Sequence, residues 1–199
     1  MSSVKALIIV DVQNDFCPGG AYPVPNGDEV VRPLNSVLKF GRKHSWKIYA
    51  SRDWHPRSAF KDNIHKAHCI QETEGAKYHP LLDIKDDIDI VSKGRDSNDT
   101  NYSAFNGDDK SLNQIMRRNK VKEVYIGGLA LEFCVRATAL DSARLGFKTY
   151  IFEDAVRHIS EEKAKKAIEE MKRAEIIFIR TSDLGKVENY LPTNINNLQ

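Results

Sequence analysis

The sequence predicts an α/β protein with a doubly wound, mostly parallel six-stranded sheet and helices on both faces. Two observations favour this fold class. Short runs of β-branched and other apolar residues alternate with longer segments of helical periodicity, which is the pattern of βαβ units. Polar residues follow several of these runs directly, as in sheets whose strands end at a ligand crevice. The chain has 199 residues, so we expect a single domain over residues 1–199.

Six strands are expected where short apolar runs are bounded by polar or turn residues. The first run is uninterrupted and ends at Asp11, and the fourth ends at a Gly-Gly pair. In chain order the strands are Ala6–Val10, Lys47–Ser51, Ile88–Ser92, Glu123–Ile126, Thr149–Phe152 and Ile176–Ile179.

Four helices are expected between the strands, at Val30–Lys43, Ser111–Asn119, Glu132–Leu145 and Glu161–Arg173. In the third helix Phe133, Ala137, Leu140 and Ala143 recur at three or four residues, which predicts that they face the sheet. The fourth begins after Ser160, a residue type that caps helix N-termini, and has two acidic residues in its first turn.

Two segments do not fit the alternation, at about 53–87 and 94–110. Loops of this length inside a compact domain usually carry function, and the first of them holds several histidines. The last residues, rich in asparagine, are expected to form a frayed tail.

Composition excludes several classes of protein. The net charge is +2, with 41% hydrophobic and 29% charged residues, so no nucleic-acid partner is expected. No apolar stretch is long enough for a membrane span or a signal peptide, and no membrane partner is expected. Three widely spaced cysteines suit reduced thiols and a cytoplasmic location.

The residues at the strand ends suggest chemistry. Cys134 lies near the start of the third expected helix, where the helix dipole favours a thiolate. Asp11 and Lys93, which follow two strands, could accept the thiol proton and hold the charge. The alternative is an ordinary Asp11–Lys93 ion pair with Cys134 as core filler.

A metal site is suggested by Asp53 and His55, which an extended backbone directs to one side. The third ligand could be His65, His68 or His79, and such a set suits zinc, iron or manganese. The alternative is that these loop histidines are simply solvated.

Five ordered motifs then carry a resemblance to a known family. They are DVQNDFCPGG from Asp11, SRDWHP from Ser51, AHCIQETEGAKYHP from Ala67, SKG with NYSAF from Ser92 and Asn101, and GGLALEFCV from Gly127. Together they resemble the nicotinamidases, members of the isochorismatase-like cysteine hydrolases, over residues 5–180 or so.

The resemblance implies specific roles. Its catalytic triad would be Asp11, Lys93 and Cys134, and its divalent metal would be bound by Asp53, His55 and His68, with no organic cofactor. A cis peptide between Leu129 and Ala130 would turn the amides of Ala130 and Cys134 into an oxyanion hole. The substrate pocket would include Phe16, Tyr102 and His65.

The implied reaction is hydrolysis of nicotinamide, a small-molecule substrate, to nicotinate and ammonia; assembly as a homo-oligomer stays open. The chain departs from the family pattern at His65-Lys66-Ala67, at Arg57-Ser58-Ala59 and at Leu131-Glu132. Two alternatives therefore remain: a related cysteine hydrolase for another small amide or for isochorismate, and a binding protein without turnover.

Overall fold

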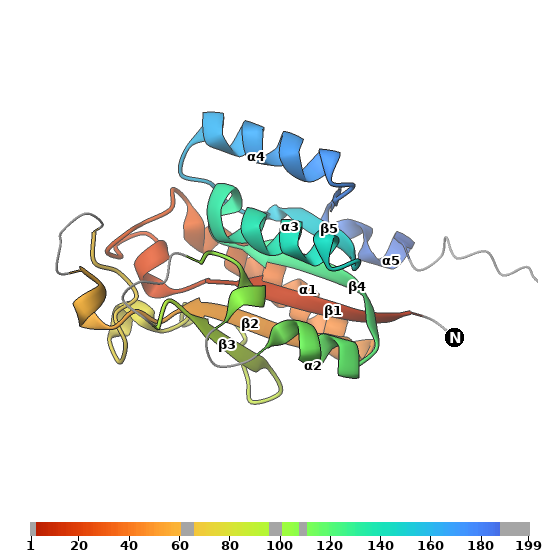
Figure 1. Ribbon diagram of the computed structural model, residues 1–199, viewed down its shortest axis with the longest axis horizontal. Helices are drawn as coiled ribbons and strands as arrows, with labels where there is room; N and C mark the ends of the chain where they lie inside the picture. Colours follow the sequence, from red (N-terminus) through yellow and green to blue (C-terminus); the bar gives the residue numbers. More distant parts are fainter. Residues whose placement is uncertain (1–2, 61–65, 96–100, 108–110, 188–199) are drawn as a thin grey trace, which may run out of the picture.

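The computed structural model describes residues 3–60, 66–95, 101–107 and 111–187 (Figure 1). Within them, six strands form one sheet in the order β3-β2-β1-β4-β5-β6, and every neighbouring pair is parallel. The strands are β1 (Val4–Val10), β2 (Lys47–Asp53), β3 (Asp89–Lys93), β4 (Val121–Gly128), β5 (Lys148–Val156) and β6 (Ile177–Ile179). The predicted fold class is confirmed, and the order reverses at β1, where the two halves of the sheet meet.

Helices cover both faces of the sheet (Figure 1). They are α1 (Val31–Lys43), α2 (Leu112–Arg118), α3 (Arg136–Arg144), α4 (Glu161–Arg173) and α5 (Leu184–Val187). Short 3₁₀ helices lie in the connections, at Asn14–Phe16, Gly27–Val30, Arg57–Phe60, Glu74–Ala76, Ala104–Asn106 and Thr181–Asp183. A π-helical turn, Leu131–Val135, here called the π turn, leads directly into α3.

Two apolar clusters hold the layers together, one on each face. Alternate residues of β1 enter opposite clusters, because successive side chains of a strand point to opposite sides. Leu7 and Ile9 pack with Leu34 and Leu38 of α1. On the other face, the neighbouring β1 residues pack with apolar residues of α2, the π turn, α3 and α4. The sheet is thus buried on both sides, as parallel sheets are.

The burial of α3 differs from the prediction. The expected sheet-facing stripe of Phe133, Ala137, Leu140 and Ala143 is only partly buried, whereas Thr138, Ala139 and Ser142 are completely buried. The reason is that small polar residues serve this interface by hydrogen bonding: Thr138 Oγ1 accepts from the amide of Ala104, and the hydroxyls of Ser142 and Thr149 lie 2.8 Å apart. Phe133, Leu140 and Ala143 pack against the margin of this core, so a pattern that counts only apolar residues finds part of the buried face and misses its polar centre.

The register brings the strand ends to one edge of the sheet. Val10 pairs with Ser51 of β2 and with Gly128 of β4. Asp53, the last residue of β2, pairs with Lys93, the last residue of β3. The segments that follow these strands gather at the left of Figure 1. The residues Asp11, Asp53 and Lys93 consequently meet at the same edge.

Gly128 is required at this edge by its backbone. Its φ is +132°, and a Cβ there would come within 2.0 Å of the carbonyl oxygen of Val10. Only glycine fits this conformation and this close approach.

The part of the chain that the structure describes contains no helix long and apolar enough to span a membrane. The expected frayed tail coincides with residues 188–199, which lie outside the described residues. The single-domain organisation over 1–199 stays a prediction.

Candidate active site

Lys93 is the centre of a buried charge cluster at the strand edge. Its side chain is completely buried, and its Nζ lies 2.8 Å from Oδ2 of Asp11. The same Nζ also donates to Oδ1 of Asp53 and lies 3.5 Å from Sγ of Cys134. One ammonium group therefore contacts two carboxylates and a thiol, and a buried lysine is stable only with such partners.

The carboxylate of Asp11 is held in a fixed orientation. The hydroxyl of Ser51 donates to its Oδ1 at 2.7 Å. Its backbone adopts a left-handed φ of +50°, which is uncommon for a residue with a side chain. Oδ2 is buried, contacts Nζ of Lys93, and accepts no well-directed hydrogen bond from the residues that the structure describes. This oxygen retains a lone pair for another donor.

The charges of the cluster depend on one another. Burial raises the pKa of Asp11 above its ordinary value, although the neighbouring Lys93 opposes this. Burial alone would lower the pKa of Lys93, but Asp11 and Asp53 raise it well above its usual range. Burial likewise opposes the charge of Asp53, but Lys93 and His55 hold the pKa of that carboxyl well below its ordinary value. The two carboxylates therefore favour the ammonium form of Lys93, and burial favours the protonated form of Asp11.

Cys134 lies in the π turn and is 5% exposed. Burial raises the pKa of its thiol well above the ordinary value, while Lys93 acts in the opposite direction. The resting sulfur is thus a thiol that needs a base before it can attack. The expected cis peptide is present between Leu129 and Ala130, directly before the turn.

Asp53, His55 and His68 form a second cluster beside the first. Each offers one ligand atom, and these atoms all lie within 4.8 Å of one another. Nε2 of His55 is 3.7 Å and Nε2 of His68 is 4.0 Å from Oδ2 of Asp53. One carboxylate and two imidazoles are a donor set that zinc, iron and manganese accept.

Both imidazoles are oriented for metal binding by their other nitrogen. Nδ1 of His55 lies 3.0 Å from the carbonyl oxygen of Gly94, and Nδ1 of His68 lies 2.7 Å from that of Lys66. A carbonyl accepts, so each Nδ1 carries the hydrogen and each Nε2 keeps its lone pair toward Asp53. Burial lowers the pKa of His68, which favours the neutral ligand form. The residues present therefore fit a divalent cation.

Gly94 makes the position of His55 feasible. Its φ is +70°, and a Cβ at this position would lie 2.3 Å from Cε1 of the His55 ring. Any larger residue would displace the imidazole.

Asp53 belongs to both clusters and is clamped by Gln13. Oδ1 of Asp53 contacts Lys93, and Oδ2 faces the two histidines. Oε1 of Gln13 accepts from the amide of Asp53, and its Nε2 donates to the carbonyls of Asp53 and Ala76, each at 2.8 Å. Gln13 thus fixes the main chain of Asp53, and with it the position of the carboxylate that the two clusters share.

Aromatic rings surround His68. Its ring centroid lies 5.5 Å from that of Phe16, 5.3 Å from Tyr22 and 5.4 Å from Phe60. Tyr102, 51% exposed, packs at 5.8 Å against Phe133 beside the thiol. Phe16 therefore lies beside the histidine cluster, and Tyr102 lies beside the π turn that carries Cys134. Their role in a substrate pocket stays a prediction. His65, the third predicted pocket residue, lies outside the described residues.

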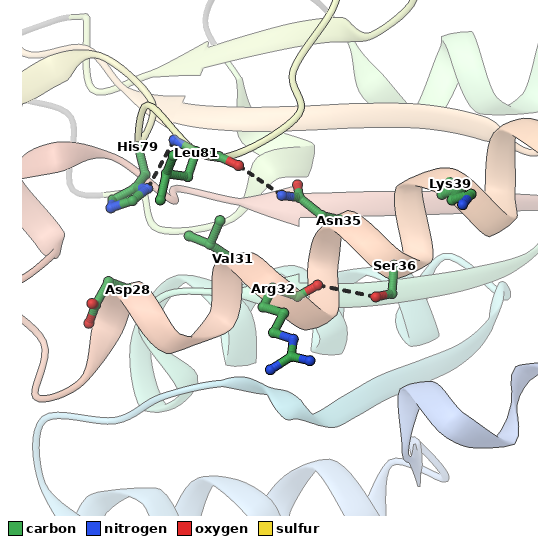
Figure 2. Close-up of a pocket in the computed structure, with 8 residues that line it drawn as sticks. All are labelled: Asp28, Val31, Arg32, Asn35, Ser36, Lys39, His79 and Leu81. Atoms are coloured by element: carbon green, nitrogen blue, oxygen red, sulfur yellow. Dashed lines mark hydrogen bonds between the residues drawn. The ribbon is translucent and has the colours of Figure 1, made fainter.

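Of the three candidates for the third metal ligand, the structure brings His68 to Asp53 and His55. His79 instead lines a separate cavity of about 500 Å³ against α1, with Val31, Asn35 and Leu81 (Figure 2). Its Nδ1 accepts from the amide of Leu81 at 3.3 Å. The lining residues of that cavity include no member of the two clusters.

Sequence reasoning missed three supporting residues, Ser51, Gln13 and Asp15. Ser51 holds Asp11, and Gln13 holds Asp53. Oδ2 of Asp15 accepts from the amide of Cys69 at 2.7 Å, which fixes the segment that carries His68. Their only signal in the sequence was their position inside the same motifs as the predicted site residues.

Comparisons with known proteins identify the family and the fold. An isochorismatase domain matches residues 5–183. The nicotinamidase of Escherichia coli (strain K12) is 34% identical over 179 residues, covering 78% of this chain and 84% of the relative. A Pyrococcus horikoshii pyrazinamidase in complex with zinc has 41% identity and a TM-score of 0.82, covering 88% of this chain and 98% of that one. The yeast nicotinamidase bound to the inhibitor nicotinaldehyde has 32% identity and a TM-score of 0.78, covering 89% and 100%.

The chain therefore belongs to the isochorismatase family. Its nicotinamidase relatives place it among the amidohydrolases of that family, and the resemblance found in the motifs is confirmed.

Proposed function

We propose that the protein hydrolyses nicotinamide to nicotinate and ammonia, with Cys134 as nucleophile and Asp11 as proton acceptor. The observation that carries the proposal is the chain of buried contacts from Sγ of Cys134 to Nζ of Lys93 at 3.5 Å and on to Asp11 at 2.8 Å. The relatives support the substrate, since they are nicotinamidases and one of them binds nicotinaldehyde, a pyridine ring with a carbonyl carbon at the same position.

The first half-reaction forms a thioester. The thiol proton of Cys134 passes to Oδ2 of Asp11, the buried oxygen with a lone pair to spare. The sulfur attacks the amide carbon, and the carbonyl oxygen becomes an oxyanion. Lys93 stabilises the thiolate and Asp11 during this transfer, because its charge faces both. When the carbon–nitrogen bond breaks, Asp11 returns its proton to the nitrogen, which leaves as ammonia.

The oxyanion would be bound by the backbone amides of Ala130 and Cys134. The cis peptide before Ala130 and the π turn around Cys134 give this short stretch its unusual backbone course. Preorganised amides directed at a developing negative charge lower the barrier without reorganisation during the reaction.

Asp53, His55 and His68 would hold the divalent cation, for which zinc is the first candidate and iron and manganese are alternatives. Zinc is favoured because the Pyrococcus relative is a zinc complex. When bound, the cation supplies a Lewis acid to which a pyridine nitrogen can bind. Phe16, beside His68, would pack against the ring and exclude water from one side of it.

The second half-reaction consumes water. A water molecule attacks the thioester carbon and gives its proton to Asp11, which is again a carboxylate after ammonia has left. The carbon–sulfur bond then breaks, nicotinate is released, and the sulfur recovers its proton from Asp11. The sum is amide plus water giving acid plus ammonia, and no organic cofactor is needed.

The test compares two amides that differ at one ring atom. We expect the zinc-loaded protein to release ammonia from nicotinamide, and to act on benzamide, which lacks the ring nitrogen, at least about 10²-fold more slowly. Equal rates would remove the role of the ring nitrogen. No ammonia from nicotinamide would overturn the proposed function.

A further inference from the structure

Glu132 is a buried carboxylate that the proposed mechanism does not use. It lies in the π turn two residues before Cys134 and is 6% exposed. Its Oε1 accepts hydrogen bonds from the backbone amides of Ile159 at 3.0 Å and Ser160 at 2.8 Å. Its Oε2 is buried without a hydrogen-bond partner among the described residues. A buried oxygen without a partner costs free energy. The two hydrogen bonds of Oε1 are therefore the contacts that favour this buried position of the side chain.

The two amides belong to the segment that starts α4. Ser160 is the N-cap of α4, and its side chain accepts from the amide of Lys163. Just before it, the carbonyl of Arg157 accepts from the amide of Leu131 at 2.8 Å. Three hydrogen bonds therefore join residues 157–160 to the π turn, and Glu132 makes two of them.

The segment is itself well anchored, so it can act as a support. Arg157 forms an ion pair with Glu29 at 2.8 Å and donates to the carbonyl of Val156, the last residue of β5. Beyond it, the ammonium of Lys163 lies 5.6 Å from the ring centroid of Phe133 in the π turn. Further along α4, Glu170 pairs with Arg136 of α3 at 2.6 Å. The start of α4 is tied to the sheet on one side and to the π turn on the other.

We infer that Glu132 is a positioning residue for the nucleophile, acting through the backbone of the π turn. The turn carries Sγ of Cys134, and the two amides proposed for the oxyanion lie two residues to either side of Glu132. By binding the amides of Ile159 and Ser160, its carboxylate fixes where these groups lie relative to Lys93. A misplacement of about 1 Å in such a constellation costs on the order of 10²-fold in rate. This inference rests on the proposed function, from which it takes the substrate, the nucleophile and the oxyanion-binding amides.

The experiment separates the acceptor from the charge. In Glu132→Gln a carbonyl oxygen still accepts both amide hydrogens, so we expect kcat for nicotinamide within about threefold of the original. Glu132→Leu removes the acceptor, and we expect kcat to fall about 10²-fold while KM and zinc content stay within about twofold. Glu132→Asp keeps the charge but is one methylene shorter, and its kcat should lie between these two. It also serves if Glu132→Leu does not fold.

A second measurement does not depend on turnover. Hydrogen exchange of the amides of Ile159 and Ser160 should be unchanged in Glu132→Gln and at least about 10-fold faster in Glu132→Leu. The matched control is Glu170→Gln, which weakens the ion pair between α4 and Arg136 of α3 and should alter neither kcat nor the two amides.

The inference predicts that kcat and protection of these two amides fall together across the variants. Any variant in which the amides lose protection while kcat is unchanged overturns it, as does a loss of kcat with full protection. Failure of the original protein to hydrolyse nicotinamide would instead overturn the proposed function. Unchanged exchange in both Glu132→Leu and Glu132→Asp would show that the contact itself is wrong.

Discussion

The two clusters at the strand edge differ in burial and in the elements that carry them. Asp11 and Lys93 are completely buried and Cys134 is 5% exposed. Asp11 follows β1, Lys93 ends β3, and Cys134 lies in the π turn after β4. The side chains of His55 and His68 are 15% and 17% exposed and belong to the segment after β2. We call Asp11, Lys93 and Cys134 the dry cluster. Electrostatic interactions are stronger where water is excluded, whereas the partly exposed donor set of Asp53, His55 and His68 can admit a cation and a ligand.

Asp53 connects the two clusters, because one of its oxygens contacts Lys93 and the other faces the histidines. Under the proposed mechanism, ligand binding and bond breaking take place on opposite sides of this carboxylate. Changes in the dry cluster should affect stability and turnover without releasing metal. Changes among the histidines should release metal and leave the dry cluster intact.

The largest effect is expected for Lys93→Met. The variant leaves the carboxylates of Asp11 and Asp53 buried without their cation. We expect the free energy of unfolding to fall by about 3–5 kcal/mol, and ammonia release to fall at least about 10⁴-fold. Urea unfolding and an ammonia assay measure both. The control is Arg42→Met, which removes surface ion pairs with Asp83 and Asp87 and should lower the free energy of unfolding by about 1 kcal/mol or less. Equal losses in the two variants would show that the buried ion pairs stabilise the protein no more than surface pairs do.

A second prediction concerns Asp11→Asn. The amide cannot accept the thiol proton, so we expect kcat to fall about 10²- to 10⁴-fold. Zinc content, measured by elemental analysis, should not change, because the three proposed ligands are Asp53, His55 and His68. If Asp11→Asn lost its zinc together with its activity, metal binding would depend on Asp11 as well.

His68→Ala tests the other side of Asp53. Losing an outer partner of a ligand costs about 10–100-fold in metal affinity, so loss of the ligand itself should cost more than about 10²-fold. The free energy of unfolding without metal should change less than in Lys93→Met, because His68 carries no buried ion pair with Lys93. Competition with a zinc chelator measures the affinity, and His79→Ala is the control that should retain it. Wild-type affinity in His68→Ala would place the cation elsewhere.

The smallest effect is expected in the pH dependence of kcat/KM. Asp11 must be a carboxylate to accept the proton, so the rate rises as pH increases through its pKa. Because burial raises that pKa, the rise should lie above the ordinary value of about 3.9 for aspartate, with a slope of about tenfold per pH unit below it. The pKa of Lys93 is raised well above its usual range, so Lys93 should cause no decline below about pH 10.4.

Zinc content must be measured at each pH, because protonated histidines release metal. If kcat/KM falls at low pH only where zinc is lost, and stays constant in zinc-saturated protein, then protonation of Asp11 is not the cause of the fall.

Much of the fold and of the dry cluster could be predicted from the sequence. Parallel strands leave long apolar runs, and whatever follows such a run lies at the carboxyl edge of the sheet. Asp11 follows β1 directly and Lys93 is the last residue of β3, so the parallel register of β1, β2 and β3 brings both to the same edge. Cys134 was predicted to lie near Asp11 and Lys93 because it comes at the start of the helix that follows β4.

The metal cluster and the supporting residues could not be derived in this way. Spacing alone left His65, His68 and His79 as candidates, because the path of a loop has no periodicity, and only the family resemblance selected His68. Asp15 settles part of that path by binding the amide of Cys69, a long-range contact that no local pattern encodes. The π turn was likewise absent from the prediction, since helical periodicity does not distinguish it from the first turn of α3.

The most direct test of the account is ammonia release from nicotinamide by the zinc-loaded protein and by Cys134→Ala. The account predicts release by the original protein, a loss of at least about 10⁴-fold in the variant, and equal zinc content in both, because Cys134 is not among the proposed ligands. Substantial hydrolysis by folded, zinc-loaded Cys134→Ala would contradict a thioester mechanism.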